Sequence, residues 1–346
     1  MQVTLYVTEP GAVVRREGRS LLVTLTRDPD GDGPLPEGRE ALLEVEPHRL
    51  DAIVLVGRVH ITREALALAF DGGIGVAWLD WRGRLLGRSV PAGWRSGDLR
   101  LAQYAAHADP ERRRSLAADF VAGKLRAADA VLRAGRSNRP GLPEIATALG
   151  EIARARARLA TAPSLDAVLG SEGAGAAAYF AGYAALVDGP QSFPGRRRRP
   201  PPDPVNALLS FGYVLLLRRV EAIVEARGLD PAIGFLHSFR AGRPSLALDL
   251  MEEFRHPLVD RLVATLFNRR QLTAAHFQEE PDAGGVRMTR DGLRRFLPLW
   301  TDRLQRPLRV EDAPDGLLPM ALVVRQADRL AVALCHGEPY RPALFK

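Results

Sequence analysis

GLDPAIGFLHSFRAGRPSLALDLMEEFR, residues 228–255, is the stretch around which most of this chain is organised. Its second half predicts a short helix from Pro244, because proline suits the first helical position, where its missing N–H would be unpaired anyway. At 100° per residue, Asp249 and Glu252 lie on one face, with Glu253 at its edge. A spacing of three residues brings Asp249 and Glu252 together over one turn. The opposite, apolar face is formed by Leu246, Ala247, Leu250, Met251 and Phe254.

This helix has two interpretations. A carboxylate face opposite an apolar face is typical of a helix at a solvated surface. The upstream loop favours a functional site instead, because its glycines, its prolines and the Leu229-Asp230-Pro231 turn would hold His237 rigidly toward the helix. An imidazole facing clustered carboxylates is a donor set that Mn²⁺ and Mg²⁺ accept.

The same stretch carries a family resemblance. The residues that carry it are Leu229-Asp230-Pro231, Gly234-Phe235-Leu236-His237, Gly242-Arg243, Ser245-Leu246-Ala247 and Asp249-Leu250-Met251-Glu252-Glu253-Phe254-Arg255. This pattern resembles the signature of the CRISPR-associated adaptation integrases, the first-numbered Cas protein. The resemblance implies a metal-dependent DNA endonuclease and integrase.

Composition limits the class of protein. The chain has 346 residues, 46% hydrophobic and 26% charged, as expected for a globular protein of two domains. Its start lacks the pattern of a signal peptide, and its longest apolar run, residues 205–217, is too short to cross a bilayer. A single cysteine, Cys335, excludes a disulfide framework and a four-cysteine metal site. We expect a cytoplasmic protein without membrane contact.

The charge is unevenly distributed along the chain. Residues 1–92 hold 11 arginines, no lysine and 13 acidic residues, a net charge of −2. Because the whole chain carries +7, the remainder carries +9. A basic C-terminal part predicts a polyanionic partner, most simply nucleic acid.

Residues 1–92 predict a β-rich domain of about eight strands. Short runs rich in β-branched residues alternate with turn residues, and residues 62–70 predict one short helix with Thr62 as its N-cap. No cluster of catalytic residue types occurs here. The family resemblance implies a β-sandwich that pairs protomers, so we expect this domain to join a homodimer. Residues 93–98 read as the linker.

From residue 99 onward the periodicity is helical. Amphipathic patterns cover residues 99–106, 110–133, 142–160, 165–183, 205–226, 245–268, 291–303 and 318–334, and residues 278–289 read as a loop. The predicted fold class is therefore α+β, with an N-terminal β-sandwich-like domain followed by a larger all-α C-terminal domain, residues 99–346. Arg100, Gln103, Tyr104 and Lys124 match an Arg-x-x-Gln-Tyr helix followed by a lysine in the family.

Glu172 is the one charge in a helical segment of small and aromatic residues that starts at Gly170. Small residues let another backbone approach closely, so Glu172 could be an exposed residue beside a packing seam. The resemblance assigns it instead as the first metal ligand.

An arginine loop follows. Arg196, Arg197, Arg198 and Arg199 precede three prolines, which predict an extended loop. Adjacent arginines on such a loop favour binding of nucleic-acid phosphates. Arg243, in the turn before the carboxylate helix, is assigned to nucleic acid with them.

Asn206, Ser210 and Tyr213 follow at i, i+4 and i+7 on one face of the next helix. By itself this polar stripe predicts a buried hydrogen-bonding seam. The Asp203-Pro204-x-Asn206 pattern around it is specific to the resembled family, which would place the stripe near the active site.

The resemblance implies a catalytic set of Glu172, His237, Asp249 and Glu252. Glu172, His237 and Glu252 would bind Mg²⁺ or Mn²⁺, and Asp249 would be a neighbour that holds a metal-bound water or a second ion. Glu253 remains a competing ligand, because spacing does not exclude it.

Two enzymatic functions fit these residues. In the first, a homodimer joined by the small second-numbered Cas protein inserts short DNA duplexes into a CRISPR array through their 3′-hydroxyl ends. In the second, the same site cleaves branched DNA in repair without integration. A third interpretation, a DNA-binding scaffold with a decayed site, is disfavoured by the complete set of acidic residues and histidine.

Overall fold

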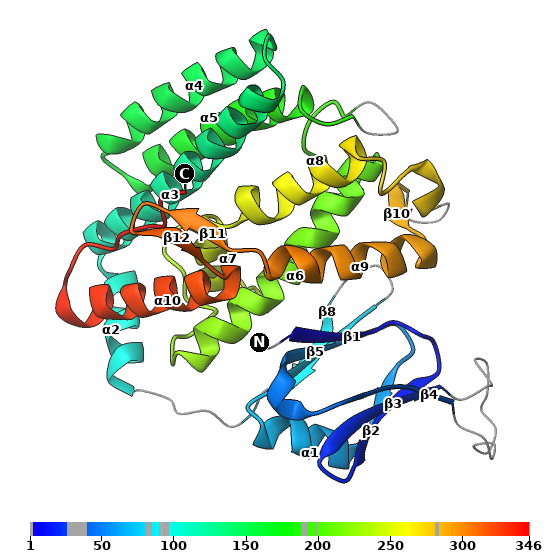
Figure 1. Ribbon diagram of the computed structural model, residues 1–346. Coiled ribbons are helices and arrows are strands. Elements are labelled where there is room, and N and C mark those ends of the chain that lie inside the picture. The colour runs from blue at the N-terminus through cyan, green and yellow to red at the C-terminus, as the bar shows by residue number, and fades with distance from the viewer. Residues whose placement is uncertain are drawn as a thin grey trace. The chain divides into compact units, whose positions relative to one another are not determined.

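The computed structural model describes residues 3–25, 40–80, 85–89, 91, 97–188, 193–197, 199–280 and 284–345. The chain divides into two compact units, Met1–Gly93 and Trp94–Lys346 (Figure 1). Among the described residues, no helix combines the length and apolarity needed to cross a membrane.

The first unit contains two mixed four-stranded sheets. One has the strand order β1-β5-β7-β8 and the other the order β4-β3-β2-β6. The bounds are β1 Val3–Val7, β2 Ala12–Glu17, β3 Ser20–Leu25, β4 Glu40–Val45, β5 Leu50–Val56, β6 His60–Ile61, β7 Gly75–Leu79 and β8 Leu85–Ser89. Eight strands in the described part of this unit agree with the predicted number.

The single helix of this unit serves a topological need. β5 and β7 are parallel neighbours, and parallel strands need a crossover connection. β6 and helix α1, Arg63–Asp71, form that crossover. Thr62 caps α1 as predicted, because its hydroxyl accepts a hydrogen bond from the backbone N–H of Ala65 at 3.2 Å.

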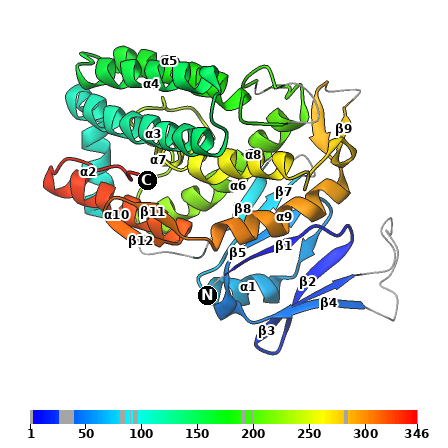
Figure 2. The same ribbon diagram turned by 45° about the horizontal axis from the view of Figure 1, so that its top comes forward.

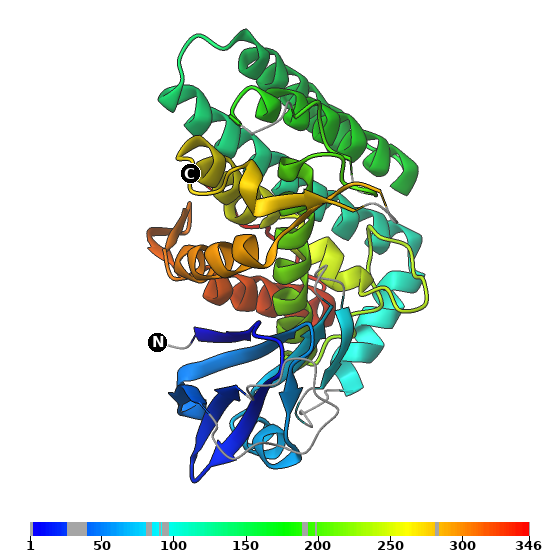
Figure 3. The ribbon, with the colours of Figure 1, turned by 90° about the vertical axis from the view of Figure 1, so that its right-hand side faces the viewer.

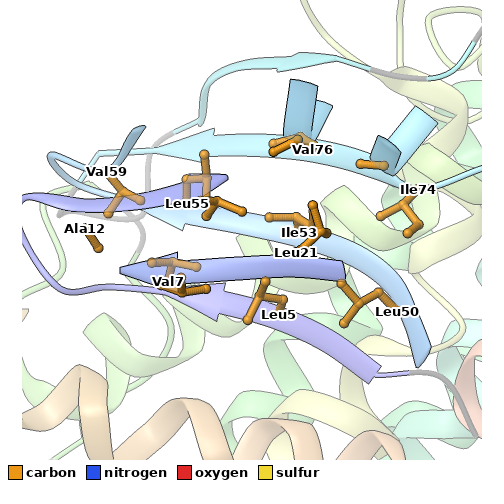
Figure 4. Packing of buried hydrophobic residues seen from close by; sticks show 14 residues of the cluster. Leu5, Val7, Ala12, Leu21, Leu50, Ile53, Leu55, Val59, Ile74 and Val76 are labelled. Carbon is orange, nitrogen blue, oxygen red and sulfur yellow. The ribbon is translucent and has the colours of Figure 1, made fainter. Parts of the chain in front are cut away.

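One hydrophobic core joins the two sheets. Leu5, Ile53 and Leu55 of the first sheet contribute to the same buried cluster as Leu21 of the second, and Figure 4 shows them together. Ala65 of α1 also belongs to it. The predicted sandwich-like arrangement is therefore confirmed.

The second unit is mostly helical. Its α-helices are α2 Gly97–Ala108, α3 Pro110–Asn138, α4 Pro143–Ala160, α5 Leu165–Ala184, α6 Pro204–Ala226, α7 Ser245–Met251, α8 Arg261–Asn268, α9 Arg290–Leu304 and α10 Pro319–His336. Gly97 and Asp98, predicted to be linker, belong to α2, and the rest of the predicted linker lies outside the described residues.

The all-α expectation for this unit is wrong in detail. β9 Phe277–Glu279 pairs with β10 Val286–Met288, within the segment predicted as a loop, and β11 Leu308–Val310 pairs with β12 Ala313–Leu317. These strands are three to five residues long. Such short strands show too few alternations for a period-2 pattern to appear in the sequence.

The helix predicted over residues 245–268 is broken. α7 ends at Met251, and a π-helical segment, η2 Arg255–Asp260, precedes α8. Pro257 is the physical reason, because it lacks an N–H and its ring clashes with the carbonyl four residues earlier. A widened π-turn accommodates this proline inside a continuous helical path.

Helices α3, α4 and α5 lie side by side, as Figure 2 shows. Gly175, from the segment of small residues that predicted close packing, permits it together with Gly182, whereas Gly170 and Gly173 face open space. A Cβ on Gly175 would lie 2.2 Å from Cδ2 of Leu125 in α3, and one on Gly182 would lie 2.6 Å from Cβ of Ala148 in α4. This close contact holds Glu172, on α5, beside α3.

Candidate active site

Helix α2 holds the loop that precedes His237. The Gln103 side chain donates to the carbonyl oxygens of Asp230 and Ile233 at 2.8 and 2.7 Å and accepts from the Asp230 N–H at 2.8 Å. The Tyr104 hydroxyl donates to the Asp230 carboxylate at 2.8 Å. Gln103 and Tyr104 of the Arg-x-x-Gln-Tyr motif therefore fix the position of this loop from α2.

Asp249 fixes the orientation of His237. Its buried carboxylate accepts hydrogen bonds from the backbone N–H groups of Phe235, Leu236 and His237 at 2.5, 3.0 and 2.9 Å. Its Oδ1 also lies 2.6 Å from Nδ1 of His237. The other ring nitrogen, Nε2, is left facing Glu252 at 3.9 Å. The structure thus places Asp249 behind the imidazole, where it is hydrogen-bonded to both the ring and the loop backbone.

Lys124 lies between the two carboxylates that the sequence singled out. Its ammonium forms an ion pair with Glu172 on α5 and another with Oε2 of Glu252 at 2.8 Å. The Lys124 side chain is only 5% exposed, so these ion pairs are shielded from water. Lys124 therefore joins Glu172 to Glu252, and His237 lies on the other side of Glu252, with Nε2 at 3.9 Å from its Oε1. The sequence marked Lys124 by resemblance only, and its position between two carboxylates was not predicted.

Glu252 is ionised despite its burial. Burial alone would raise the pKa of this carboxyl group, but the positive charges of Arg255 and Lys124 outweigh it and lower the pKa below its usual value. Arg255 contributes through an ion pair with Oε1 of Glu252 at 3.2 Å. The sequence marked Arg255 by resemblance only, and its ion pair with Glu252 was not predicted.

Glu253 has different partners. Its carboxylate accepts hydrogen bonds from the Tyr340 hydroxyl, from the Ala343 N–H at 2.6 Å and from the Gln326 side chain at 3.2 Å. Burial raises the pKa of Glu253 to about 7, although these hydrogen bonds oppose the shift. Its contacts tie α7 to the C-terminal segment, and none of them involves Glu172 or His237.

The interpretation of a solvated surface helix is wrong. Asp249 and Glu253 are 0% exposed and Glu252 is 2% exposed, so both faces of this helical turn are buried. Buried carboxylates need charged or hydrogen-bonding partners. Each of the three has such partners, and each has a different set.

The polar stripe of α6 forms a buried seam. Oδ1 of Asn206 accepts from the Arg197 N–H at 2.8 Å and from the Arg196 guanidinium at 2.9 Å. The Ser210 hydroxyl accepts from the same guanidinium at 2.9 Å, and the Tyr213 hydroxyl donates to Oδ1 of Asp260 at 2.6 Å. The stripe therefore anchors the arginine loop to α6.

The four arginines of that loop do not behave alike. The Arg196 guanidinium is bound to the seam and lies over the Tyr213 ring, 5.4 Å from its centroid. Arg197 and Arg199 are exposed, and Arg198 lies outside the described residues. Arg243 is partly exposed in the turn before α7. A direct phosphate contact is thus open to Arg197 and Arg199, whereas Arg196 has a structural role.

The donor chemistry suits a hard divalent cation. In the described ranges, no three carboxylate, imidazole or thiol groups lie close enough together to hold a metal ion. Around Glu172 and Glu252 the Lys124 ammonium takes the central place. Oε2 of Glu252 is buried without a well-formed hydrogen bond, and among the described residues it is met by this ion pair. Two carboxylates and an imidazole would fit Mg²⁺ or Mn²⁺ in place of that ammonium.

The chain matches a known family over most of its length. The family model for the CRISPR-associated protein Cas1 matches residues 5–302. A CRISPR-associated endonuclease Cas1 of Thermus thermophilus is 39% identical, with 98% of each chain covered. One of Rhodospirillum rubrum is 38% identical, with 91% of each chain covered.

Solved structures are similar in fold. A casposase bound to its integration product has a TM-score of 0.83 at 24% identity, covering 99% of this chain and 93% of the casposase. A Cas6-RT-Cas1–Cas2 complex contains a chain with a TM-score of 0.76 at 22% identity, covering 98% of this chain and 36% of that one. The family match and the two relatives together identify the protein. The chain belongs to the CRISPR-associated Cas1 family of endonucleases and integrases, as its sequence predicts.

Proposed function

We propose that this protein inserts short DNA duplexes into a CRISPR array, with Glu172, His237 and Glu252 as the ligands of Mg²⁺ or Mn²⁺. The observation that carries the proposal is that three chain segments meet at Glu252, which shares the Lys124 ammonium with Glu172 and faces Nε2 of His237 at 3.9 Å. A cation bound there would polarise the scissile phosphodiester and activate a water molecule or a 3′-hydroxyl group.

The surrounding residues prepare the ligands. Asp249 accepts from Nδ1 of His237 and so directs Nε2 toward Glu252. Arg255 keeps Glu252 ionised through its ion pair. Lys124 holds Glu172 and Glu252 together and offsets their mutual repulsion, so the site is organised before any cation arrives.

The substrate class follows from charge. The part of the chain after residue 92 carries +9, which suits double-stranded DNA, branched or with free 3′-hydroxyl ends. The similar casposase is described on its integration product, and a similar Cas1 chain occurs in a complex with Cas2. We infer that DNA and Cas2 are partners of this protein too, and that it acts as a homodimer that assembles with Cas2.

A strand-transfer assay tests the function. Purified protein with Cas2 is incubated with short duplexes bearing 3′-hydroxyl ends and a plasmid that contains a repeat array. We expect covalent joining of the duplexes to the plasmid in Mn²⁺ or Mg²⁺, and none when the ends carry 3′-dideoxy nucleotides. Efficient cleavage of branched DNA without joining would favour the repair nuclease instead.

Arg197 and Arg199 should contact DNA phosphates. Each phosphate contact contributes about −0.9 to the slope of log K against log salt, so replacing both with alanine should flatten that slope by about one to two units. The variant R154A/R158A removes the same charge from exposed positions on α4 and is the control. Fluorescence anisotropy at several salt concentrations measures the slope. An equal slope in both variants would rule out the contact.

The N-terminal unit should join two protomers. It has its own core and a net charge of −2 over residues 1–92, and the ligand residues lie outside it. Removing residues 1–92 should leave a helical fragment that sediments as a monomer, whereas the full chain sediments as a dimer. Circular dichroism checks that the fragment stays folded. A folded fragment that remains dimeric would locate the protomer contact in the helical unit.

A further inference from the structure

A cavity of about 480 Å³ lies among α3, α8, α9 and β11. Its lining includes five arginines: Arg261, Arg269, Arg303, Arg306 and Arg309. We refer to it as the arginine cavity. None of Lys124, Glu172, His237 and Glu252 lines it. Figure 3 shows that α9, which lines the cavity, lies at one side of the helical unit. The yellow-green loop before α7, which carries His237, lies at the other side.

The positive charge of the arginine cavity is not balanced by the protein. Asp302 is the one carboxylate in the lining, and it bonds to Arg306 at 2.5 Å. Among the described residues, no carboxylate forms an ion pair with Arg261, Arg269, Arg303 or Arg309. Like charges that line one cavity repel one another, so an anion in the cavity would be stabilised.

Arg303 shows the crowding most directly. Its guanidinium donates to the carbonyl oxygen of Pro257 at 2.8 Å, which holds it in the wall of the cavity. Burial, reinforced by the positive charges of Arg261 and Arg306, lowers the pKa of Arg303 to about 10. A positively charged guanidinium group is therefore held in the wall of the cavity beside those of Arg261 and Arg306.

The chemistry of the lining favours nucleic acid over a protein segment. Guanidinium groups donate hydrogen bonds and never accept them, and the phosphodiester backbone offers acceptors without donors. An acidic peptide would also bring backbone N–H groups, and Asp302, the one carboxylate acceptor in the lining, is already bonded. Arg261 begins α8 and Arg269 directly follows its last residue. Eight residues at 1.5 Å per residue separate them by about 12 Å, so they can reach separate phosphates of one strand.

Part of the cavity lining is apolar. Val131, Leu262, Leu299 and Phe345 contribute to it. Apolar lining combined with a few charged groups is the usual form of a site for a small ligand with a polar end. A sugar or base could contact these apolar residues while the arginines bind the adjoining phosphates.

We propose that the arginine cavity is a second DNA-binding site that grips backbone phosphates apart from the metal ligands. It requires no cation and so does not depend on the catalytic proposal. Its role is to hold a length of DNA on the protein while another part of the duplex, or a second duplex, is at Glu172, His237 and Glu252.

The test compares two triple variants of the full chain. R261Q/R269Q/R309Q removes three exposed arginines of the cavity, and R63Q/R154Q/R158Q removes three exposed arginines elsewhere. Affinity for a labelled DNA duplex is measured against salt concentration in EDTA, which keeps divalent cations out. The cavity variant should flatten the slope of log K against log salt by about two to three units. The control variant should change the slope by less than about one unit.

Two results would overturn the proposal. One is an equal change of slope in both variants. The other is a cavity variant that binds DNA like the unaltered chain but no longer binds a polyglutamate peptide, which would assign the cavity to an acidic protein. Strand transfer by the unaltered protein is scored separately, so failure of this site and failure of the catalytic proposal are distinguishable.

Discussion

Alanine in place of Glu172, His237 or Glu252 is expected to abolish both DNA cleavage and strand transfer. A metal ion stabilises the charge of the phosphoryl-transfer transition state by several kcal/mol, so loss of one ligand should lower the rate on the order of a thousandfold. DNA affinity in EDTA should change little, because the proposed phosphate contacts involve other residues. Initial rates of strand transfer and anisotropy with labelled duplex provide the two measurements.

Metal binding gives a readout independent of activity. Calorimetric titration with Mn²⁺ should detect a site in the unaltered chain and none in E172A or E252A. D249N should weaken Mn²⁺ binding by about 10-fold to 100-fold without removing it, because Asp249 acts through His237. Full activity of H237A in both Mg²⁺ and Mn²⁺ would show that this site is not the catalytic one.

Glu253 is the matched control for Glu252. Alanine at Glu253 leaves the Ala343 N–H and the Gln326 side chain without their buried acceptor, so it should destabilise the fold by about 1–3 kcal/mol. Under conditions where E253A is folded, it should retain strand transfer, while E252A should not. An active E252A together with a folded, inactive E253A would move the ligand by one position.

Gly234→Ala is expected to cause the largest loss of stability among single substitutions in the loop. A Cβ at this position would lie 2.6 Å from Oδ2 of Asp249 and 2.7 Å from the backbone carbon of Ser245. Backbone atoms cannot rotate away, and Asp249 is held by three backbone N–H groups, so the loop must shift. Such overpacking costs about 3 kcal/mol.

Urea denaturation measures this effect, and Gly173→Ala is its control. Gly173 lies in α5 with nothing within 4 Å of its Cβ position, so alanine there should stabilise the chain by about 0.5–1 kcal/mol through helix propensity. G234A should also lose strand transfer, because Asp249 would no longer orient His237. A G234A variant with the urea midpoint of the unaltered chain would contradict the tight packing of this loop.

Local sequence patterns determined much of this protein. The strands of the first unit and the helices of the second follow from periods of 2 and 3.6, since each element buries one face regardless of what covers it. Thr62 caps α1 and the small residues of α5 admit close neighbours for equally local reasons. The family follows as well, because its motif is a linear pattern of residue types between Glu172 and Arg255.

The roles of individual residues in the candidate site were decided by contacts with other segments of the chain. Adjacent residues Glu252 and Glu253 differ in role because Lys124 and Arg255 meet one, while Tyr340 and Ala343 meet the other. Contacts between segments also place Asp249 behind His237. They bind the Arg196 guanidinium to Asn206 and Ser210 of α6, so Arg196 is not among the arginines that we propose to contact DNA.

The arginine cavity exists only where α3, α8, α9 and β11 meet, and no single segment carries its pattern. A helical period states which way a side chain points from its own axis. The charged groups and hydrogen-bonding partners that surround the side chain come from other segments of the chain. They determine the pKa of a buried carboxyl group and the residues to which it bonds.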